Sequence, residues 1–558
     1  MVIVRRALVA CCAAALAACS ARPKTAGSGD SAGRLTVFVT TEVKGQTEPC
    51  GCTSDPMGDL ARTAALIAGA RRAGPVVVVD GGSLLYGEAR VRPDRAVQAE
   101  RKADLVAEVY RDRLGAAAIG LGPFDLASGP DGVRLPRQAA NARGVRTEPP
   151  KVIDAGGVRV GVFGVVDPAR VAKAGVDASD PVAAARDAVR SLAADGAQVI
   201  VALLHMSRAD ARSLAAAVPG IHLAVVGADA PEPDRVSPAP ERAGDAWLVQ
   251  PANRGQVVSR IDLTWRGPGP LADAIGPARA RAELAELDRR IAVVEADVAK
   301  FAADPAADPT FVAAQRADLA ELRARRAALA AEPLRVPAEG SYFVLEQIPI
   351  RKALACDADV VAKKRAYDLA VGRDNLARAP AEPPPVPPGQ AGYAGIGECA
   401  FCHADAVAFW RGTVHARAWE TLEQLGKQYD LECVYCHVTG FDRPGGATLK
   451  TLANPPEGES LRDVQCEVCH GPASLHVDAD GKERPRSLVR APPVDTCVTC
   501  HNELHSDTFD YEAYLRDVTG PGHGEAFRAR LGDGPTGRQL RRAALEAAGA
   551  AIGEGCDK

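Results

Sequence analysis

The sequence is poor in aromatic residues, carries little net charge and lacks any internal apolar run long enough to cross a membrane. Aromatic residues make up 4% of its 558 residues, and the formal net charge is -4 at pH 7. With no broad positive field and few rings to stack on bases, nucleic acid is excluded as a partner. A spanning helix needs roughly 18 apolar residues, and no internal segment reaches that length. Since 47% of the residues are hydrophobic and 25% charged, the length predicts three or four globular units.

The N-terminus predicts export and a lipid anchor. Two arginines precede a short apolar stretch, residues 7–18, as is typical of a secretory signal. The stretch ends in Leu-Ala-Ala-Cys19, which resembles the lipobox of bacterial lipoproteins and implies that Cys19 carries the lipid. Residues 1–19 are then a signal peptide and 20–33 a flexible tether. An ordinary cleaved signal that happens to contain a cysteine is the alternative.

The residue after the anchor bears on location. Ser20 follows Cys19, which resembles outer-membrane sorting. We therefore expect a protein anchored in the outer membrane through its lipid, with the body facing the periplasm or the cell surface.

Four copies of C-x-x-C-H dominate the last third of the chain. They are Cys399, Cys402 and His403; Cys433, Cys436 and His437; Cys466, Cys469 and His470; and Cys497, Cys500 and His501. Two thiols three positions apart can each form a thioether to one haem, and the following histidine then reaches the iron. Zinc sites do not need a histidine after every second cysteine, and a thioredoxin-like motif would occur once. The sequence thus predicts four covalently attached c-type haems.

Methionine is too scarce to supply the sixth iron ligands. The three methionines, at positions 1, 57 and 206, all lie outside the haem region, whereas eight of the ten histidines lie between 403 and 523. Beyond the four proximal ligands, the remaining candidates are His415, His476, His505 and His523. His476 and His505 follow a motif histidine by only six and four positions, too few to reach the other face of the same haem. Each should bind a neighbouring haem, so the haems should lie close together.

Residues 395–530 resemble the tetrahaem cytochrome c-554 family. The likeness rests on Phe-Trp-Arg-Gly-Thr-Val-His415, on His437-Val-Thr-Gly and on Gln-Cys466-Glu-Val-Cys-His-Gly-Pro-Ala-Ser-Leu-His476. In that family three haems have two histidine ligands, and the haem of the second motif has an open face. The resemblance implies that His415, His476 and His523 are distal ligands and that His437 holds the open iron. His505 departs from the family pattern, and it either closes the fourth iron or is a surface residue.

The N-terminal half alternates strands and helices, which predicts an α/β sandwich. Expected strands are 35–41, 76–79, 158–166, 199–205, 223–227 and 257–265, with helices such as 62–72 and 183–195. Their order resembles the metallophosphoesterase domain of 5'-nucleotidases over residues 34–270. That fold uses two metals to activate water and to clamp a phosphoryl group.

The metal ligands of that family are missing here. Its first Asp-x-His appears as Glu42-Val-Lys44, a later aspartate as Ser83, and its final Gly-His-x-His as residues 227–230, Gly-Ala-Asp-Ala. Its Gly-Asn-His-Glu-Phe-Asp appears as Gly-Leu-Gly-Pro-Phe-Asp125. His205 remains, and we interpret it as a packed residue at a strand end. A metal-dependent phosphohydrolase is therefore the weakest functional hypothesis, and no catalytic residue is assigned.

Cys50 and Cys52 form a C-x-C pair on the loop after the first strand. Adjacent thiols of this kind seldom bond each other because the ring is strained. One interpretation is that they form disulfides with Cys356 and Cys556 in an oxidising compartment. The other is a thiolate metal or redox site that exchanges electrons with the haems.

The sequence of residues 272–394 predicts segments that separate the two halves of the chain. Residues 272–332 have helical spacing broken by an Asp-Pro-Ala-Ala-Asp-Pro segment, which indicates a helical hairpin. Residues 333–394 form a connector that ends in a proline-rich linker at 379–388. The tail, 531–558, predicts a helix without evident chemistry.

These features favour a multihaem cytochrome that transfers electrons to and from redox partner proteins. In this hypothesis the degenerate α/β domain is a scaffold or a docking face. The rival hypothesis is a redox enzyme that acts on a small nitrogen or sulfur species at an open His437 haem.

Overall fold

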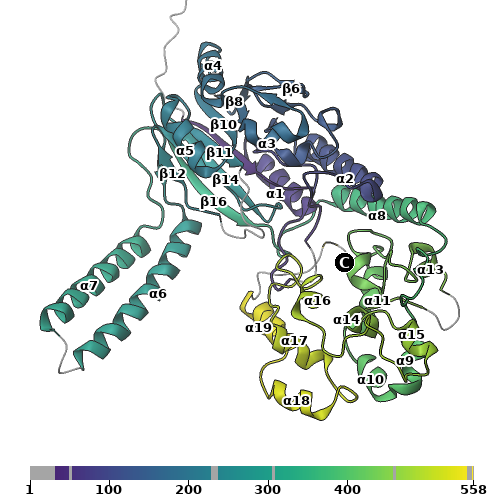
Figure 1. Ribbon diagram of the computed structural model, residues 1–558. Coiled ribbons are helices and arrows are strands. Elements are labelled where there is room, and N and C mark those ends of the chain that lie inside the picture. The colour runs from purple at the N-terminus through teal and green to yellow at the C-terminus, as the bar shows by residue number, and fades with distance from the viewer. Residues whose placement is uncertain are drawn as a thin grey trace, which may run out of the picture.

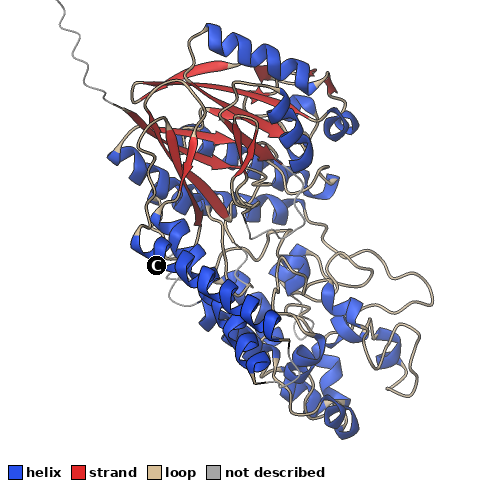
Figure 2. Cartoon of the chain, turned by 90° about the vertical axis from the view of Figure 1, so that its left-hand side faces the viewer, coloured by secondary structure: helices blue, strands red, loops and turns tan. Residues whose placement is uncertain are grey.

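The computed structural model describes residues 32–49, 53–227, 237–303, 308–455, 460–548 and Cys556. Two six-stranded sheets pack face to face in the N-terminal half, and a region of short helices and loops follows (Figure 1, Figure 2). The chain is thus multidomain, and the predicted α/β sandwich and the mostly helical C-terminal region are both confirmed. None of the helices in these ranges is long and apolar enough to cross a membrane.

The first sheet has the strand order β15-β16-β14-β1-β2-β3. Its strands are β1 (Gly33–Thr40), β2 (Val76–Asp80), β3 (Ala118–Ile119), β14 (Val257–Trp265), β15 (Ala272–Ala274) and β16 (Tyr342–Pro349). β2 runs parallel to β1, whereas β14 is antiparallel to both β1 and β16. The sheet therefore extends past residue 270 into the segments that the sequence assigned to the hairpin and the connector.

The second sheet has the order β12-β13-β11-β10-β8-β7. Its strands are β7 (Lys151–Ala155), β8 (Val158–Val166), β10 (Val199–His205), β11 (Leu223–Gly227), β12 (Glu241–Ala243) and β13 (Ala246–Val249). Every residue of β10 is buried. Side chains alternate across a strand, so Val201 and Leu203 face the first sheet while Ala202 and Leu204 face the helical layer.

Helices cover the outer face of each sheet. Those on the first sheet are α1 (Leu60–Ala73), α2 (Ala96–Glu108) and α8 (Ala358–Arg378), and those on the second are α4 (Pro181–Ala194) and α5 (Arg208–Ala217). Short elements complete the half: β4 (Arg137–Gln138), β5 (Ala142–Arg143), β6 (Thr147–Glu148), β9 (Asp177–Ala178) and α3 (Pro168–Val171). Asp59 caps the N-terminus of α1, and its carboxylate accepts hydrogen bonds from the first-turn amides of Ala61 and Arg62.

A helical hairpin projects from the first sheet (Figure 1). It consists of α6 (Pro277–Ala302) and α7 (Pro309–Ala331), and it is inserted between β15 and β16. Leu287 and Leu329 are buried between the two helices near the sheet. At the far end the rings of Phe301 and Phe311 pack edge to face, with their centroids 5.2 Å apart.

The C-terminal region is built from short helices. They are α9 (Ile396–Cys402), α10 (Ala404–Trp410), α11 (Ala418–Glu423), α12 (Val434–His437), α13 (Leu449–Ala453), α14 (Cys466–His470), α15 (Ser474–Asp478), α16 (Val494–Val498), α17 (Tyr511–Val518), α18 (Glu525–Leu531) and α19 (Gly537–Ala548). A small apolar cluster around Trp419, Val434 and Leu449 supports the second motif. Most of the region instead lines a large cavity.

A disulfide joins Cys356, just before α8, to Cys556 in the C-terminal tail. The two cysteines are 200 positions apart in the sequence. The interpretation that Cys356 and Cys556 pair with Cys50 and Cys52 is therefore wrong, because these two cysteines pair with each other.

Replacing Cys356 with alanine is expected to cost about 2–4 kcal/mol of stability, because the cross-link restricts the unfolded chain. Thermal melts of wild type and variant, with and without reductant, measure the effect. Reductant should lower the wild-type Tm toward that of the variant and leave the variant unchanged. Equal melting temperatures for the two oxidised proteins would contradict the expectation.

Candidate haem site

The four C-x-x-C-H motifs surround one cavity of about 2250 Å³. Its lining includes cysteine and histidine side chains from every motif. The first motif lies at the end of α9, the second and third form α12 and α14, and the fourth starts in α16. In a helical turn, residues three apart share a face, so both thiols of a motif can point to the same side. The motifs thus fit four groups held within one shared space.

Thiols from different motifs lie next to one another. Cys399 of the first motif is hydrogen-bonded to Cys466 of the third. Cys500 of the fourth motif is likewise hydrogen-bonded to Cys436 of the second. Burial raises the pKa of Cys469 of the third motif to about 12, and the nearby Cys497 of the fourth motif acts in the same direction. The attachment points are therefore neighbours in the order first, third, fourth, second.

Backbone carbonyls orient several of the histidines. The Nδ1 atom of His437 lies 2.7 Å from the carbonyl oxygen of Ala418, and that of His470 lies 2.8 Å from the carbonyl of Val489. His476 makes the same kind of contact with Glu483. An imidazole that donates from Nδ1 leaves Nε2 as the metal ligand, and such a bond fixes the ring orientation. These contacts fit iron ligation.

His415 and His501 face each other with their ring centroids 6.1 Å apart. A metal–imidazole bond is about 2 Å long, so two rings on opposite faces of one iron have centroids about 6 Å apart. Burial, together with His501, lowers the pKa of His415 to about 4, which keeps its imidazole neutral. The spacing would suit two imidazoles that together hold one haem iron at the fourth motif.

The other distal candidates also lie near motif histidines. Burial lowers the pKa of His523, and the nearby His470 lowers it further. Burial also lowers the pKa of His505, and both Arg254 and His437 act in the same direction. His476 lies on α15, whose first residue, Ser474, exchanges hydrogen bonds with Gly392 ahead of the first motif. Each candidate histidine is thus associated with a different C-x-x-C-H motif.

Loops of the N-terminal half cover one side of the cavity. Gln46, Glu48, Tyr86 and Arg254, from loops that follow β1, β2 and β13, contribute to its lining. Open α/β sheets place ligands at the carboxyl ends of their parallel strands. The haem region therefore lies against the edge of the sandwich where such a fold would expose a substrate site.

A partly buried charge cluster joins the two halves. Glu48 pairs with Lys364 at 2.9 Å and with Lys427, and Lys427 also lies 3.2 Å from Asp368. Burial alone would raise the pKa of Glu48, but the two lysines overcome it and lower the pKa to about 2. Burial dominates at Asp368 and raises its pKa to about 6, against the opposing effect of Lys427.

Residues at the metal positions of the phosphoesterase family pair with one another. Lys44 Nζ lies 3.2 Å from Glu42 Oε2, and His205 Nε2 lies 3.7 Å from Glu42 Oε1. His205 Nε2 also lies 3.3 Å from the hydroxyl oxygen of Ser83. All four side chains are buried, and the interpretation of His205 as a packed residue at a strand end is confirmed. The positions that bind metal in that family therefore hold a buried lysine, Lys44, close to the Glu42 carboxylate, which also lies near the His205 imidazole.

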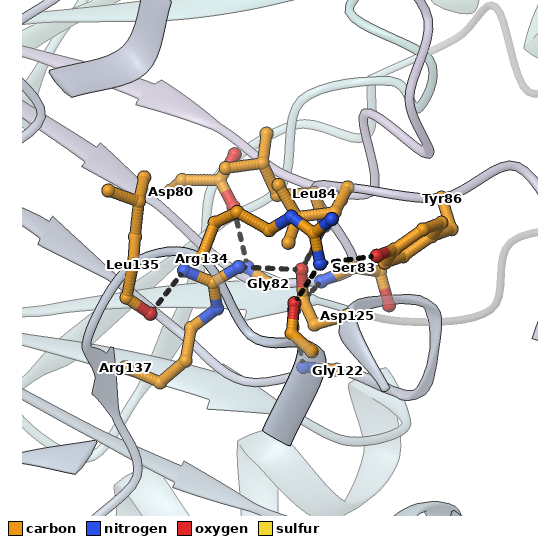
Figure 3. Close-up of polar contacts among 12 residues, drawn as sticks. Asp80, Gly82, Ser83, Leu84, Tyr86, Gly122, Asp125, Arg134, Leu135 and Arg137 are labelled. Atoms are coloured by element: carbon orange, nitrogen blue, oxygen red, sulfur yellow. Dashed lines mark hydrogen bonds and ion pairs between the residues drawn. The ribbon is translucent and has the colours of Figure 1, made fainter. Parts of the chain in front are cut away.

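Asp125 organises the loops beside these residues (Figure 3). Its carboxylate accepts hydrogen bonds from the backbone amides of Ser83, Leu84 and Gly122, at 2.9, 2.9 and 3.0 Å. Arg137 Nη2 donates to the same carboxylate at 3.0 Å, and both side chains are fully buried. The aspartate therefore acts as a structural anchor in this half.

Several residues singled out by the sequence lie outside the described ranges. They are Cys19, Cys50, Cys52 and positions 228–230. Pro49 and Thr53, on either side of the C-x-C segment, line the cavity. Sequence reasoning did not single out Glu48, Arg254, Asp368 or Lys427, because ordinary charged residues far apart in sequence give no signal of a shared interface.

Comparison with known proteins agrees with this geometry. Residues 398–471 match the family described as cytochrome c554 and c-prime. The C-terminal region is a c-type cytochrome module. The match spans the first three motifs. Cytochrome c-554 of Nitrosomonas europaea is 30% identical over 139 residues, which cover 20% of this chain and 57% of that protein. Covalently bound c-type haem is therefore the cofactor of this module.

Solved structures resemble the sheet-rich N-terminal half. A 5'-nucleotidase precursor from Thermus thermophilus has a TM-score of 0.40 at 20% identity, covering 63% of this chain and 61% of that one. A sulfate thiohydrolase from the same organism has a TM-score of 0.41 at 16% identity, covering 62% of each chain.

Proposed function

We propose that this protein is an exported tetrahaem cytochrome that passes electrons between redox partner proteins. The observation that carries the proposal is that all four motifs and eight histidines gather at one cavity. Haems attached there would be near neighbours, as rapid electron transfer requires. The lipid on Cys19 would hold the protein at the outer membrane, with its body in the periplasm or at the cell surface.

Each bound haem supplies an iron centre that takes up and releases one electron. The chain sets the properties of that centre through its ligands. Methionine ligation raises haem potentials. The sequence placed all methionines outside the haem region, but Met57, on a loop of the N-terminal half, lines the cavity beside the eight histidines. The histidines supply enough ligands for two on each of four irons. We therefore expect low potentials, and a potentiometric titration that finds every haem strongly positive would contradict this assignment.

The N-terminal half acts in this proposal as a scaffold that covers the cytochrome. Its loops line the haem cavity, and the ion pairs of Glu48 hold the two halves together. The residues at the former metal positions are engaged with one another inside the sandwich. A docking and shielding role fits this arrangement better than phosphate chemistry.

Mass spectrometry of the denatured mature protein tests the haem count. We expect the polypeptide mass plus four haems, because each motif supplies its own pair of thioether bonds. The double variant Cys399→Ala/Cys402→Ala should carry three haems. The matched control, Cys356→Ala, alters a cysteine outside the motifs and should keep four. Fewer than four haems on fully matured wild-type protein would refute the proposal.

A further inference from the structure

His505 is the histidine that the likeness to the cytochrome c-554 family leaves without a role. It lies in a tight turn directly after the fourth motif. Its backbone N–H donates to the carbonyl of Asn502 at 3.0 Å, and the next residue, Ser506, donates to the same carbonyl at 2.7 Å. The side chain of Asn502 accepts a bond from the amide of Leu504 at 3.1 Å. The turn therefore presents His505 in a defined position.

Ser54 of the N-terminal half holds this turn through two hydrogen bonds to Asp507. The backbone amide of Ser54 donates to Asp507 Oδ1 at 2.9 Å, and the Ser54 hydroxyl donates to the other carboxylate oxygen at 2.5 Å. Asp507 lies two positions after His505. A contact that joins residues 453 positions apart thus fixes the turn against the other half of the molecule.

His505 does not belong to the haem of the fourth motif. The ring of His501 faces His415, and the ring of Phe509 stacks on it at a centroid distance of 5.4 Å. The hydroxyl of Ser506 lies 3.2 Å from His501 Nδ1. His505 instead lines the same cavity as His437, Glu432 and Arg254, and these are the charged or titratable residues near enough to act on the pKa of His505.

The remaining histidines already have their own partners. His415 faces His501, and His523 lies near His470. The helix that carries His476 is tied through Ser474 to Gly392, in the segment that leads into the first motif and its His403. Of the four motif histidines, His437 is thus the one left for His505.

We propose that His505 is the sixth ligand of the iron at His437, so that this haem has no open face. The Ser54–Asp507 contact is a positioning device that holds the ligand in place. This inference rests on the proposed attachment of four haems. It removes the site that a redox enzyme would use, and it makes the N-terminal half part of the support for that ligand.

Electron paramagnetic resonance of the oxidised full-length protein tests the ligation. We expect low-spin haem only in the wild type. His505→Ala should convert one haem in four to high spin and should let the reduced protein bind carbon monoxide, and added imidazole should restore the low-spin signal. His222→Ala is the matched control: it removes a partly buried histidine beside Trp265, and the spectrum should not change.

A second variant tests the positioning role of the Ser54–Asp507 contact. Asp507→Asn should leave four haems attached but give a mixture of high-spin and low-spin signal at the His437 haem. A high-spin haem in the wild type, or an unchanged spectrum in His505→Ala, would overturn the ligand assignment. Mass spectrometry on the same samples separates this failure from that of the proposed function, which alone predicts four haem masses.

Discussion

Replacing Asp125 with asparagine is expected to lower the unfolding free energy of the N-terminal half by about 3–5 kcal/mol, the usual cost of breaking a buried ion pair. The change leaves the guanidinium of Arg137 buried without its anion. The new amide group also cannot accept all the backbone hydrogen bonds that the carboxylate accepts from Ser83, Leu84 and Gly122. The midpoint of denaturant unfolding, followed by far-UV circular dichroism, measures the loss.

Two further variants make this result specific. Asp187→Asn removes a carboxylate whose partner, Arg190, is as exposed as Asp187 itself, so its effect should stay within about 0.5 kcal/mol. The double variant Asp125→Asn/Arg137→Met should recover part of the loss, because the unpaired charge is gone. A midpoint shift in Asp125→Asn no larger than that of the exposed control would show that the buried pair contributes little.

The second large effect is expected at the contact between the two halves. Lys427→Met leaves the partly buried carboxylates of Glu48 and Asp368 without the cation that they share. We expect a loss of about 3–5 kcal/mol at pH 8, where both carboxylates are ionised in the wild type. The two halves should separate more readily, and limited proteolysis of the linker at 379–388 should become faster.

The pH dependence of this variant follows from the pKa values of its neighbours. The pKa of Asp368 is already raised to about 6, and loss of Lys427 raises it further. Below that pKa the group is neutral and no longer needs a cation, so the defect should shrink as the pH falls from 8 to 5. The wild-type Glu48 behaves in the opposite way. Its pKa is lowered to about 2, so its stabilising effect is present above about 4.5 and is lost as the pH falls toward 2.

A double variant identifies the source of the defect. Lys427→Met/Asp368→Asn should be more stable at pH 8 than Lys427→Met alone, because one of the uncompensated charges is absent. Thermal melts at pH 5 and pH 8 provide the measurement. A Lys427→Met defect that does not vary with pH would point to lost packing instead of lost charge.

The candidate haem attachment motifs can be recognised in the sequence because the chemistry that they serve is covalent and local. Each motif must place two thiols and one imidazole within five consecutive positions, so the sequence alone displays the whole attachment site. The strands were predictable for a similar reason. An apolar run such as Val199–His205 is buried on both faces, and it forms a strand in the middle of its sheet.

Features that depend on distant residues were not predictable. The bond between Cys356 and Cys556 spans 200 positions, and nothing in the local sequence favours that partner over Cys50 or Cys52. β16 returns to the first sheet only after the hairpin, so its place beside β14 depends on the tertiary fold. The same is true of Lys427 and Glu48, whose pairing requires both halves to be folded and in contact.

The bond between Cys356 and Cys556 determines which fragments would separate after proteolytic cleavage. It closes a covalent ring that contains the proline-rich linker and all four haem motifs. A single protease cut anywhere inside that ring leaves the fragments joined as one particle. Separation of the cytochrome from the N-terminal half would therefore need reduction of the bond in addition to that cut, or a second cut on the other side of the haem motifs.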